Sequence, residues 1–180
     1  MSLGSQAVER IETARLVGTK PLLRDADELH PLLADARVAE WLWPGDLGGP
    51  RTLAQTRALL VKDADRWKRQ GFGPWVWRDA QTGAMVGRAG LAGYTLEGQE
   101  EVEIGYLIDA DRWGQGLASE ITRASIEVAF DQLGLETLIA FTQPHNLASR
   151  AVMERCGMTY EREFIHADLP HVLYRIRREN

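Results

Sequence analysis

The sequence has one cysteine, Cys156, and no apolar run that approaches the length of a membrane span. A single cysteine excludes an intrachain disulfide, so a reducing, cytoplasmic location is expected. A spanning helix needs about 20 apolar residues, so no membrane association is predicted. The histidines and the cysteine form no cluster with the spacing of metal ligands, and no metal site is predicted.

Positive charge is also scarce: 21 Lys and Arg residues stand against 26 Asp and Glu residues, a formal net charge of −5. Proteins that bind nucleic acid use Lys and Arg to contact phosphates, so nucleic acid is not expected as the main partner. A negative surface is mildly favourable for cationic amines. The N-terminus has no basic and then apolar pattern, so no secretion signal is expected.

The size and composition of the chain suit one globular domain. The 180 residues are enough for a full core, and 44% of them are hydrophobic. Residues 1–12 are expected to form a tail, and residues 13–180 a single domain. Sequence does not determine the oligomeric state; a homodimer is the assembly considered.

One stretch past the midpoint organises the chain. Apolar residues alternate over Glu101–Ile108, which predicts a strand. From Leu117 to Val128 they recur every three or four positions, which predicts one face of a helix. Gly114 and Gly116 lie between the two elements.

A glycine turn at a helix start is an anion-binding device, because the first N–H groups of the helix are unpaired and its dipole is positive there. A P-loop is excluded, since no Lys followed by Ser or Thr comes after the glycines. The dinucleotide fingerprint is also excluded, because Ser119 occupies the place of its third glycine.

The remaining patterns predict a mixed α/β fold with a central, mostly antiparallel sheet of about six to seven strands flanked by helices. The strands at 74–78, 85–96 and 101–108 are expected as an antiparallel meander, and the strand at 137–142 as a parallel neighbour of the last. The other expected elements are a strand over 13–24 broken near 18–21, a helix capped by Asp25, an apolar segment 38–43, a loop 44–50, a helix 52–70, a helix 146–156 and strands 159–165 and 172–177.

The loop Trp113-Gly114-Gln115-Gly116-Leu117-Ala118 resembles the pyrophosphate loop of the GNAT superfamily of N-acetyltransferases, which bind acetyl-coenzyme A (acetyl-CoA). Trp113 departs from the leading Gln or Arg of that loop. The Trp-Gly-x-Gly-x-Ala pattern is similar to the branch that acetylates the N-terminal alanine of ribosomal proteins. Further resembling stretches are Thr13-Ala14-Arg15-Leu16, Gly71-Phe72-Gly73-Pro74-Trp75, Gly87-Arg88-Ala89-Gly90-Leu91, and Asn146-Leu147-Ala148-Ser149 through Cys156-Gly157-Met158.

The resemblance implies a set of residues that bind the cosubstrate acetyl-CoA. The backbone of Leu107 and Ile108 would bond its pantetheine arm and polarise the thioester. Asn146 would bind the same arm, or cap its helix, or both. The pyrophosphate would lie on the loop and first helical turn formed by Trp113, Gly114, Gln115, Gly116, Leu117, Ala118 and Ser119.

Catalysis is assigned to Glu103 and Ser149. Many relatives use a Tyr four residues before the helix-ending glycine as the acid for the departing thiolate. Met153 stands there, so this role, or a cofactor contact, passes to Ser149. Glu103 is the candidate base, directly or through water, and Glu101 is expected to be a solvated strand carboxylate.

Other reactive side chains are expected to be structural. Cys156 is predicted to be a small buried hydrophobe rather than an acyl carrier. The histidines His30, His166 and His171 are expected at the surface or in turns. Trp41 is considered, with Trp43, as a wall of a substrate groove.

The predicted function is direct acetyl transfer to a primary amine in a ternary complex. The expected acceptor is a protein or peptide N-terminal α-amine. The alternatives are a small-molecule amine or antibiotic acetyltransferase, and a non-catalytic acyl-CoA-binding module, which Met153 keeps open. The α-amine is favoured because it is nearly neutral at physiological pH and needs little base. A contribution of Glu103 is expected to matter most at acid pH, where more of the amine is protonated.

Overall fold

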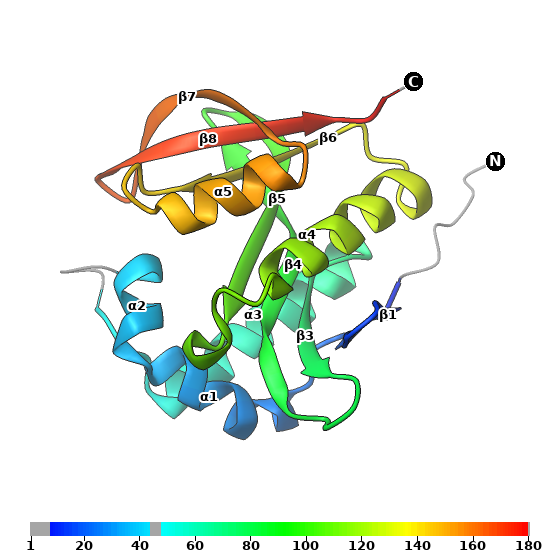
Figure 1. Cartoon of the computed structure of the whole chain (residues 1–180), viewed down its shortest axis with the longest axis vertical. Helices are drawn as coiled ribbons and strands as arrows, with labels where there is room; N and C mark the ends of the chain where they lie inside the picture. Colours follow the sequence, from blue (N-terminus) through cyan, green and yellow to red (C-terminus); the bar gives the residue numbers. More distant parts are fainter. Residues whose placement is uncertain (1–7, 44–47, 180) are drawn as a thin grey trace.

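The computed structural model describes residues 8–43 and 48–179, which form one sheet with helices on both faces (Figure 1). The sheet has eight strands in the order β1-β2-β3-β4-β5-β6-β8-β7. The strands are β1 (Arg10–Glu12), β2 (Leu16–Thr19), β3 (Pro74–Asp79), β4 (Met85–Leu96), β5 (Gln99–Ile108), β6 (Thr137–Thr142), β7 (Thr159–His166) and β8 (Leu169–Arg177).

Helices precede and follow the central meander. They are α1 (Ala26–Ala34), α2 (Ala36–Leu42), α3 (Leu53–Gln70), α4 (Leu117–Glu127) and α5 (Leu147–Arg155). Short segments are the 3-10 turns η1 (Leu23–Asp25) and η3 (Ala110–Arg112) and the π-helical turn η4 (Val128–Gln132). None of the helices in the described part of the chain has the length and apolar content needed to cross a bilayer.

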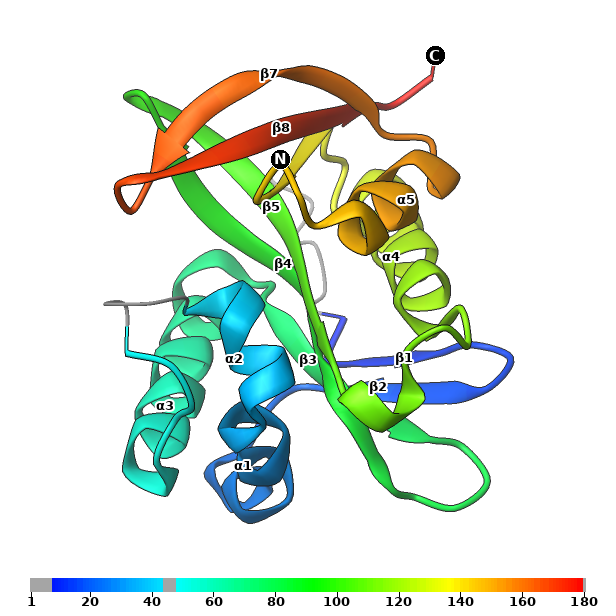
Figure 2. The ribbon, with the colours of Figure 1, turned by 60° about the vertical axis from the view of Figure 1, so that its left-hand side comes forward.

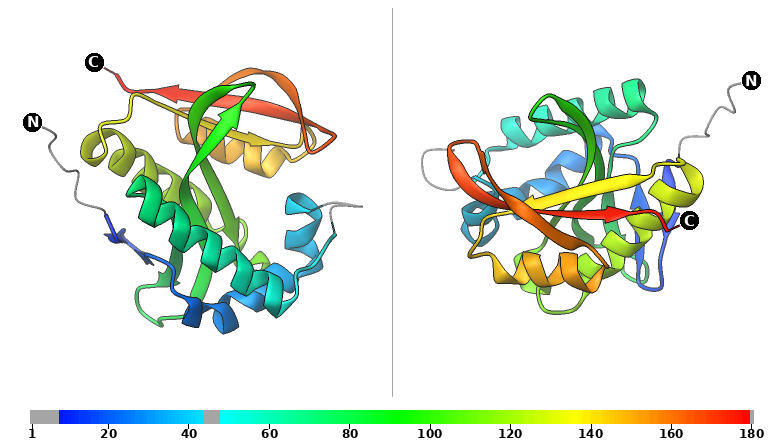
Figure 3. Two further views of the ribbon diagram at one scale, coloured as in Figure 1. Left: turned by 180° about the vertical axis from the view of Figure 1, so that it is seen from behind. Right: turned by 90° about the horizontal axis from the view of Figure 1, so that it is seen from above.

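Figure 2 shows the sheet between two helical layers, with α1, α2 and α3 on one side and α4 and α5 on the other. Seen from behind, α3 covers the meander, and from above, α5 lies along one side of β6, β7 and β8 (Figure 3). All recorded pairings are antiparallel except that of β5 with β6. The fold class, the meander and the parallel pair are therefore confirmed.

Local signals placed α3 and the meander correctly. The Thr52 side chain accepts from the Gln55 N–H while Gln55 bonds back to the Thr52 N–H, the predicted capping box. Gly71 ends α3 with a left-handed φ of 76°. The strand β4 has the predicted bounds, Met85–Leu96.

The N-terminal third differs from the prediction. The strand expected over 13–24 covers only Leu16–Thr19, and the segment expected as a tail contributes β1. The Asp25 side chain makes no cap for α1, because it accepts from the Leu22 N–H at 2.7 Å and pairs with Arg78 at 3.0 Å. Residues 1–7 of the expected tail lie outside the described residues.

The apolar segment expected at 38–43 is mostly the helix α2. Asp35 caps it by accepting from the Arg37 N–H at 2.8 Å. Of the loop expected at 44–50, residues 44–47 lie outside the described residues.

The last hairpin turns earlier than expected. Ala167 and Asp168 have positive φ angles of 50° and 61°, so β8 begins at Leu169 instead of 172.

Candidate active site

Strands β5 and β6 meet at one position and then separate. Their parallel pairing is recorded at Glu103 opposite Ile139, whereas β5 pairs with β4 along nearly its whole length. Figure 1 shows β5 running away from β6 beyond this point. The end of β5 therefore no longer has β6 as a hydrogen-bonding partner.

The orientation of the β5 amides follows from its ladder with β4. The Asp109 N–H donates to the Val86 carbonyl at 2.8 Å. Backbone groups of an antiparallel strand alternate between its two sides, so the Leu107 N–H faces β4, while those of Tyr106 and Ile108 face the open side. The Ile108 N–H thus faces the open side, whereas the Leu107 N–H, predicted to bond the pantetheine arm, is directed to β4.

The connection from β5 to α4 holds two glycines in the left-handed conformation. Gly114 has a φ of 76° and Gly116, the N-cap of α4, a φ of 75°. A Cβ at Gly114 would meet nothing within 4 Å, and one at Gly116 only Arg15 Nη2 at 3.8 Å. Open space over the glycines adjoins unpaired helix N–H groups, the arrangement that suits a phosphate.

The rest of the predicted loop is anchored on both sides. Trp113 is exposed, and its indole N–H donates to the Ile108 carbonyl at 2.9 Å. Leu117 is buried in the core and fixes the start of α4. Ala118 is partly buried, and the Ser119 side chain is buried.

Arg15 braces this loop from the bend that precedes β2. Its guanidinium donates to the Gln115 carbonyl at 2.9 Å and to the Glu120 carboxylate at 2.6 Å, and the Thr13 hydroxyl donates to Glu120 at 2.6 Å. Burial raises the pKa of Glu120, but the hydrogen bonds from Thr13 and Arg15 together outweigh this effect, so the net pKa is lowered. The brace neutralises a carboxylate that would otherwise repel an anion at the helix start. The Thr-x-Arg-Leu stretch carried this role, which sequence did not assign.

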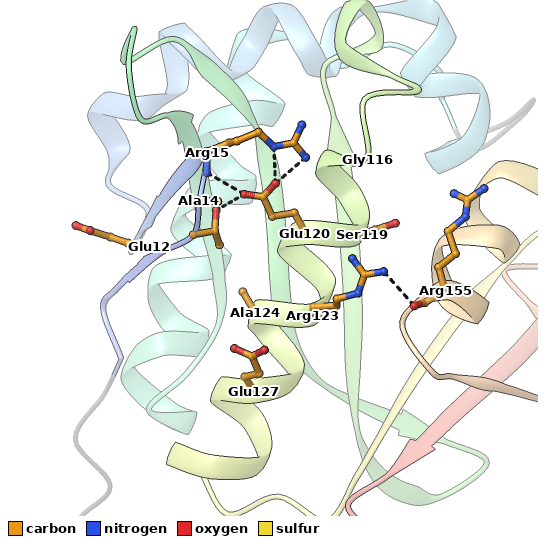
Figure 4. Close-up of a pocket in the computed structure, with 11 residues that line it drawn as sticks. Glu12, Ala14, Arg15, Gly116, Ser119, Glu120, Arg123, Ala124, Glu127 and Arg155 are labelled. Atoms are coloured by element: carbon orange, nitrogen blue, oxygen red, sulfur yellow. Dashed lines mark hydrogen bonds and ion pairs between the residues drawn. The ribbon is translucent and has the colours of Figure 1, made fainter.

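A pocket of about 600 Å³ continues from the glycine loop along the outer face of α4 (Figure 4). Within it, Arg123 donates to the Arg155 carbonyl at 3.2 Å. The pocket therefore offers cationic side chains next to the anion-binding loop. It is lined by Glu12, Thr13, Ala14, Arg15, Gly116, Ser119, Glu120, Arg123, Ala124, Glu127 and Arg155.

The start of α5 faces β5. Asn146 is its N-cap and accepts from the Ser149 N–H at 3.1 Å, as predicted. The Tyr106 hydroxyl lies 2.8 Å from Ser149 Oγ and donates to the Ser149 carbonyl at 3.0 Å. Tyr106 was predicted only as a strand residue, because the contact joins positions 43 residues apart.

Glu103 lies on the other face of β5 from Tyr106, since side chains alternate along a strand. Burial raises the pKa of Glu103 to about 7, against the opposing fields of Arg66 and Arg88. Arg88 is held by Asp63, with Nε 2.6 Å from Oδ2. Among the described residues, the Glu103 carboxyl makes no hydrogen bond or ion pair. A carboxyl that titrates near neutral pH suits a general base.

Two expectations near Glu103 are wrong. Glu101 is not solvated, because it forms an ion pair of 2.8 Å with Arg175 and its side chain is 12% exposed. His171 is buried rather than at the surface. The ion-pair partner of Glu101 lies on a strand distant in sequence, and the His171 ring packs against Phe141 of β6 and His166 of β7. A local sequence pattern does not show such contacts.

An aromatic and histidine cluster lies on the Glu103 face. Tyr94 is opposite Glu101 in the β4–β5 ladder, and its hydroxyl is 2.9 Å from His166 Nδ1. The ring of Phe141 lies 4.9 Å from that of His166. Burial, with a smaller effect of His171, lowers the pKa of His166. The cluster gives the Glu103 face of the sheet a mostly apolar neighbourhood.

Helix α2 reaches the loop that precedes α5. The ring of Trp41 lies 5.3 Å from that of His145, and Gln143 Nε2 donates to the Trp41 carbonyl at 3.3 Å. These contacts place Trp41 beside the site, where sequence considered it as a groove wall.

Cys156 and Met153 are both buried in the core. Cys156 is buried, its thiol contacts the Ser119 carbonyl at 3.5 Å, and burial raises its pKa. A thiol held protonated is a poor nucleophile. Met153 is 1% exposed and packs in the core.

A family model described as the acetyltransferase (GNAT) domain matches residues 15–159. The chain therefore belongs to the GNAT family of acetyltransferases. It is an acetyl-CoA-dependent N-acetyltransferase, which confirms the predicted enzyme class and cosubstrate. The open glycine loop and the diverging strands fit the pyrophosphate and pantetheine of that cosubstrate.

Three curated relatives are similar in sequence. The uncharacterized protein YkkB of Bacillus subtilis is 30% identical over 70% of this chain and 73% of its own length. The uncharacterized N-acetyltransferase YnaD of the same species is 35% identical over 84% and 83%. The FsC-acetyl coenzyme A-N(2)-transacetylase of Aspergillus fumigatus is 38% identical, over 53% of this chain and 43% of that protein.

Solved structures share the fold. An acetyltransferase from Agrobacterium tumefaciens has a TM-score of 0.79 and 28% identity, with 94% of each chain covered. RimL, a ribosomal L7/L12 α-N-protein acetyltransferase solved with coenzyme A, has a TM-score of 0.78 and 19% identity, over 94% of this chain and 98% of that chain. At that identity the likeness to RimL concerns the fold alone.

Proposed function

We propose that this enzyme transfers the acetyl group of acetyl-CoA directly to the α-amine of a protein or peptide N-terminus, in a ternary complex. The observation that carries the proposal is the end of β5. The strand leaves β6 there, with the amides of Tyr106 and Ile108 on its open side and Glu103 on one face. Donor and amine can meet at this strand.

Donor binding is assigned to backbone groups. The loop from Trp113 to Ser119 binds the pyrophosphate through N–H groups at the start of α4. The N–H groups of Ile108 and Tyr106 bond the pantetheine arm and polarise the thioester carbonyl. In this proposal the Tyr106 N–H replaces the Leu107 N–H, which the sequence analysis assigned to the pantetheine arm. Asn146 adds its side-chain NH₂ to the pantetheine arm while Oδ1 caps α5.

Glu103 accepts the proton of the attacking amine, directly or through one water. Its pKa of about 7 changes the expected pH dependence. Below that pH the Glu103 carboxyl is itself protonated and cannot act as a base. Its contribution is therefore largest above pH 7, and not on the acid side as the sequence alone predicted.

The acid–base equipment favours an α-amine over a lysine. An amine attacks only when neutral, and near pH 7.5 roughly a third of α-amines are neutral, against about one lysine in a thousand. Glu103 with a pKa of about 7 is well matched to an α-amine of pKa ~7.7–8.0. It lies about three units below a lysine.

The relative in Aspergillus fumigatus, at 38% identity, points to a rival acceptor class, whereas RimL is like this chain in fold alone. RimL acetylates a protein α-amine by its description, whereas the fungal enzyme is described as an FsC N(2)-transacetylase. A small-molecule amine is therefore the second candidate acceptor.

A thiol-release assay with matched acceptors tests the proposal. One peptide carries a free N-terminal Ala or Ser and an acetylated lysine, and its partner an acetylated N-terminus and a free lysine. We expect the first to have a kcat/KM about 10-fold higher or more. Polyamines and aminoglycosides form the third arm.

The control is the same peptide with both amines blocked, which corrects for hydrolysis. Faster turnover of the lysine peptide or of a small amine would overturn the α-amine assignment. Binding of acetyl-CoA without acceptor-dependent thiol release in any arm would favour a non-catalytic acyl-CoA-binding module.

A further inference from the structure

Tyr106 and Ser149 form a pair of hydroxyl groups between β5 and α5. The Tyr106 Oη lies 2.8 Å from Ser149 Oγ and 3.0 Å from the Ser149 carbonyl oxygen. Burial raises the pKa of Tyr106, and its bond to Ser149 lowers it by less. The phenol is therefore protonated throughout the working pH range and has one hydrogen to donate.

Counting hydrogens leaves two arrangements for this pair. The carbonyl oxygen can only accept, so in the first arrangement Tyr106 donates to it and Ser149 Oγ–H donates to Tyr106 Oη. In the second, Tyr106 donates to Ser149 Oγ, and the Ser149 hydrogen is free for another acceptor. The Ser149 carbonyl then keeps its helical acceptor role alone. The two differ only by rotation of the hydroxyl hydrogens.

We propose that Tyr106 is a positioning residue for Ser149, whose hydroxyl the family resemblance already assigns to the leaving thiolate of coenzyme A, and that the two hydroxyls act as a switch. This inference rests on the proposed function, which places the thioester at the open side of β5. Before reaction the Ser149 hydroxyl donates its hydrogen bond to Tyr106 Oη. As the C–S bond breaks, Tyr106 turns its hydrogen to Ser149 Oγ, and Ser149 donates to the sulfur.

The switch stabilises an anion and does not transfer a proton. The new C–N bond forms at the acetyl carbon, and the electron pair of the C–S bond leaves with the sulfur. The amine proton goes to Glu103. A thiolate whose conjugate thiol has a pKa of ~8.5 is too weak a base to take a proton from a phenol or a serine, which are both less acidic. The thiolate therefore leaves hydrogen-bonded and takes its proton from solvent. Tyr106 is thus a positioning residue that acts through Ser149.

The switch predicts a measurable property of the product complex. Bound coenzyme A should have a lower thiol pKa than free coenzyme A, because the pair stabilises its thiolate. The thiolate is followed by its ultraviolet absorbance during a pH titration of the binary complex. We expect Tyr106→Phe and Ser149→Ala each to raise the bound-thiol pKa by about one unit, the scale of one hydrogen bond to a charged group.

Kinetics give a second readout. Tyr106→Phe should lower kcat about 10-fold with little change in KM for acetyl-CoA, because the bond to sulfur strengthens only as charge develops. The double variant should resemble Ser149→Ala alone, since Tyr106 acts only through the Ser149 hydroxyl.

Tyr174→Phe is the matched control, because Tyr174 on β8 also bonds to α5 through its hydroxyl. The Tyr174 hydroxyl accepts from Arg150 Nε at 3.1 Å and donates to Glu154 at 2.8 Å, so this variant also removes hydroxyl bonds to α5. It should leave the bound-thiol pKa unchanged. Ser149→Ala, which deletes one hydroxyl from the first turn of α5, supplies the measurement if Tyr106→Phe is poorly folded.

The outcomes separate this inference from the proposed function. Calorimetry with coenzyme A comes first, and absence of binding to the wild-type protein would overturn the proposed function. Binding with the same thiol pKa in the wild-type, Tyr106→Phe and Ser149→Ala proteins would overturn the switch. An equal shift in Tyr174→Phe would also overturn it, because helix displacement would then explain the effect.

Discussion

Glu103 and Glu101 show how the same residue type acquires different properties two positions apart on one strand. Glu101 is neutralised by Arg175 at 2.8 Å. Glu103 has no such partner among the described residues, and burial raises its pKa to about 7. The difference comes from β8, which places Arg175 over Glu101. Alternation alone predicts both carboxylates on one face and cannot separate them.

The raised pKa of Glu103 predicts a pH-dependent stability. The folded state holds the proton up to about pH 7, while the unfolded chain releases it near the ordinary value of 4.5. Between these values the folded state binds more protons, so its stability falls as pH rises. Glu103→Gln should remove this fall and stabilise the protein above pH 7 by on the order of 2 kcal/mol, measured by urea unfolding across pH.

The same substitution should lower activity. We expect a loss of ~10²-fold in kcat/KM above pH 7, the lower end of general-base catalysis, and a smaller loss below it. Glu100→Gln is the control, because Glu100 is an exposed carboxylate on the same strand. A loss that grows toward acid pH, or an unchanged stability profile, would contradict the assignment of Glu103.

Sequence identified Glu103, Ser149 and Asn146 as site candidates, because each lies in a short recognisable stretch. It gave no role to Tyr106 or Arg15. Their functions arise from contacts with residues 43 and 100 or more positions away, and such contacts exist only after the sheet has formed.

At the scale of elements, local chemistry predicted best where one signal decided the structure. Capping at Thr52, the left-handed Gly71 and the hairpin turn before β4 fixed α3 and the meander. The helix α2 was missed because its apolar run is too short to show the repeat of apolar residues that indicates a helix. Asp25 was assigned as a cap, yet the bond to Arg78 on β3 uses its carboxylate. Tertiary contacts overrode the local signal there.

The glycine loop gives a prediction that isolates charge from shape. Gly116→Asp should weaken acetyl-CoA binding about 30-fold, since about 2 kcal/mol is the scale of a charged contact made unfavourable. Gly116→Asn has the same size and the same left-handed φ of 75° to adopt, so it should lose far less. Isothermal calorimetry measures both.

Steric disruption is not expected at this position, because a Cβ there meets only the flexible end of Arg15 at 3.8 Å. Equal affinities of the Asp and Asn variants would show that charge at the loop is unimportant. Unchanged affinity in both would remove the loop from the binding site.

At the scale of the molecule, the two helical layers share the same strands. The core beneath α4 includes Trp75 and Trp77, and the core beneath α1 and α3 includes the intervening Val76. Because neighbouring residues of β3 belong to different cores, unfolding of β3 would expose both cores at once. The single-domain boundaries, the cytoplasmic location and the homodimer stay predictions.

This shared sheet predicts that acetyl-CoA stabilises the whole chain at once. A ligand at 100 times its Kd adds about 2.7 kcal/mol to the free energy of unfolding, which raises Tm by about 5–10 °C for a chain of this size. Calorimetric scanning should show one transition that shifts as a unit. Gly116→Asp should retain the transition and lose most of the shift at the same ligand concentration. Two transitions, of which acetyl-CoA moves only one, would mean that the meander does not couple the donor side of the site to the amine side.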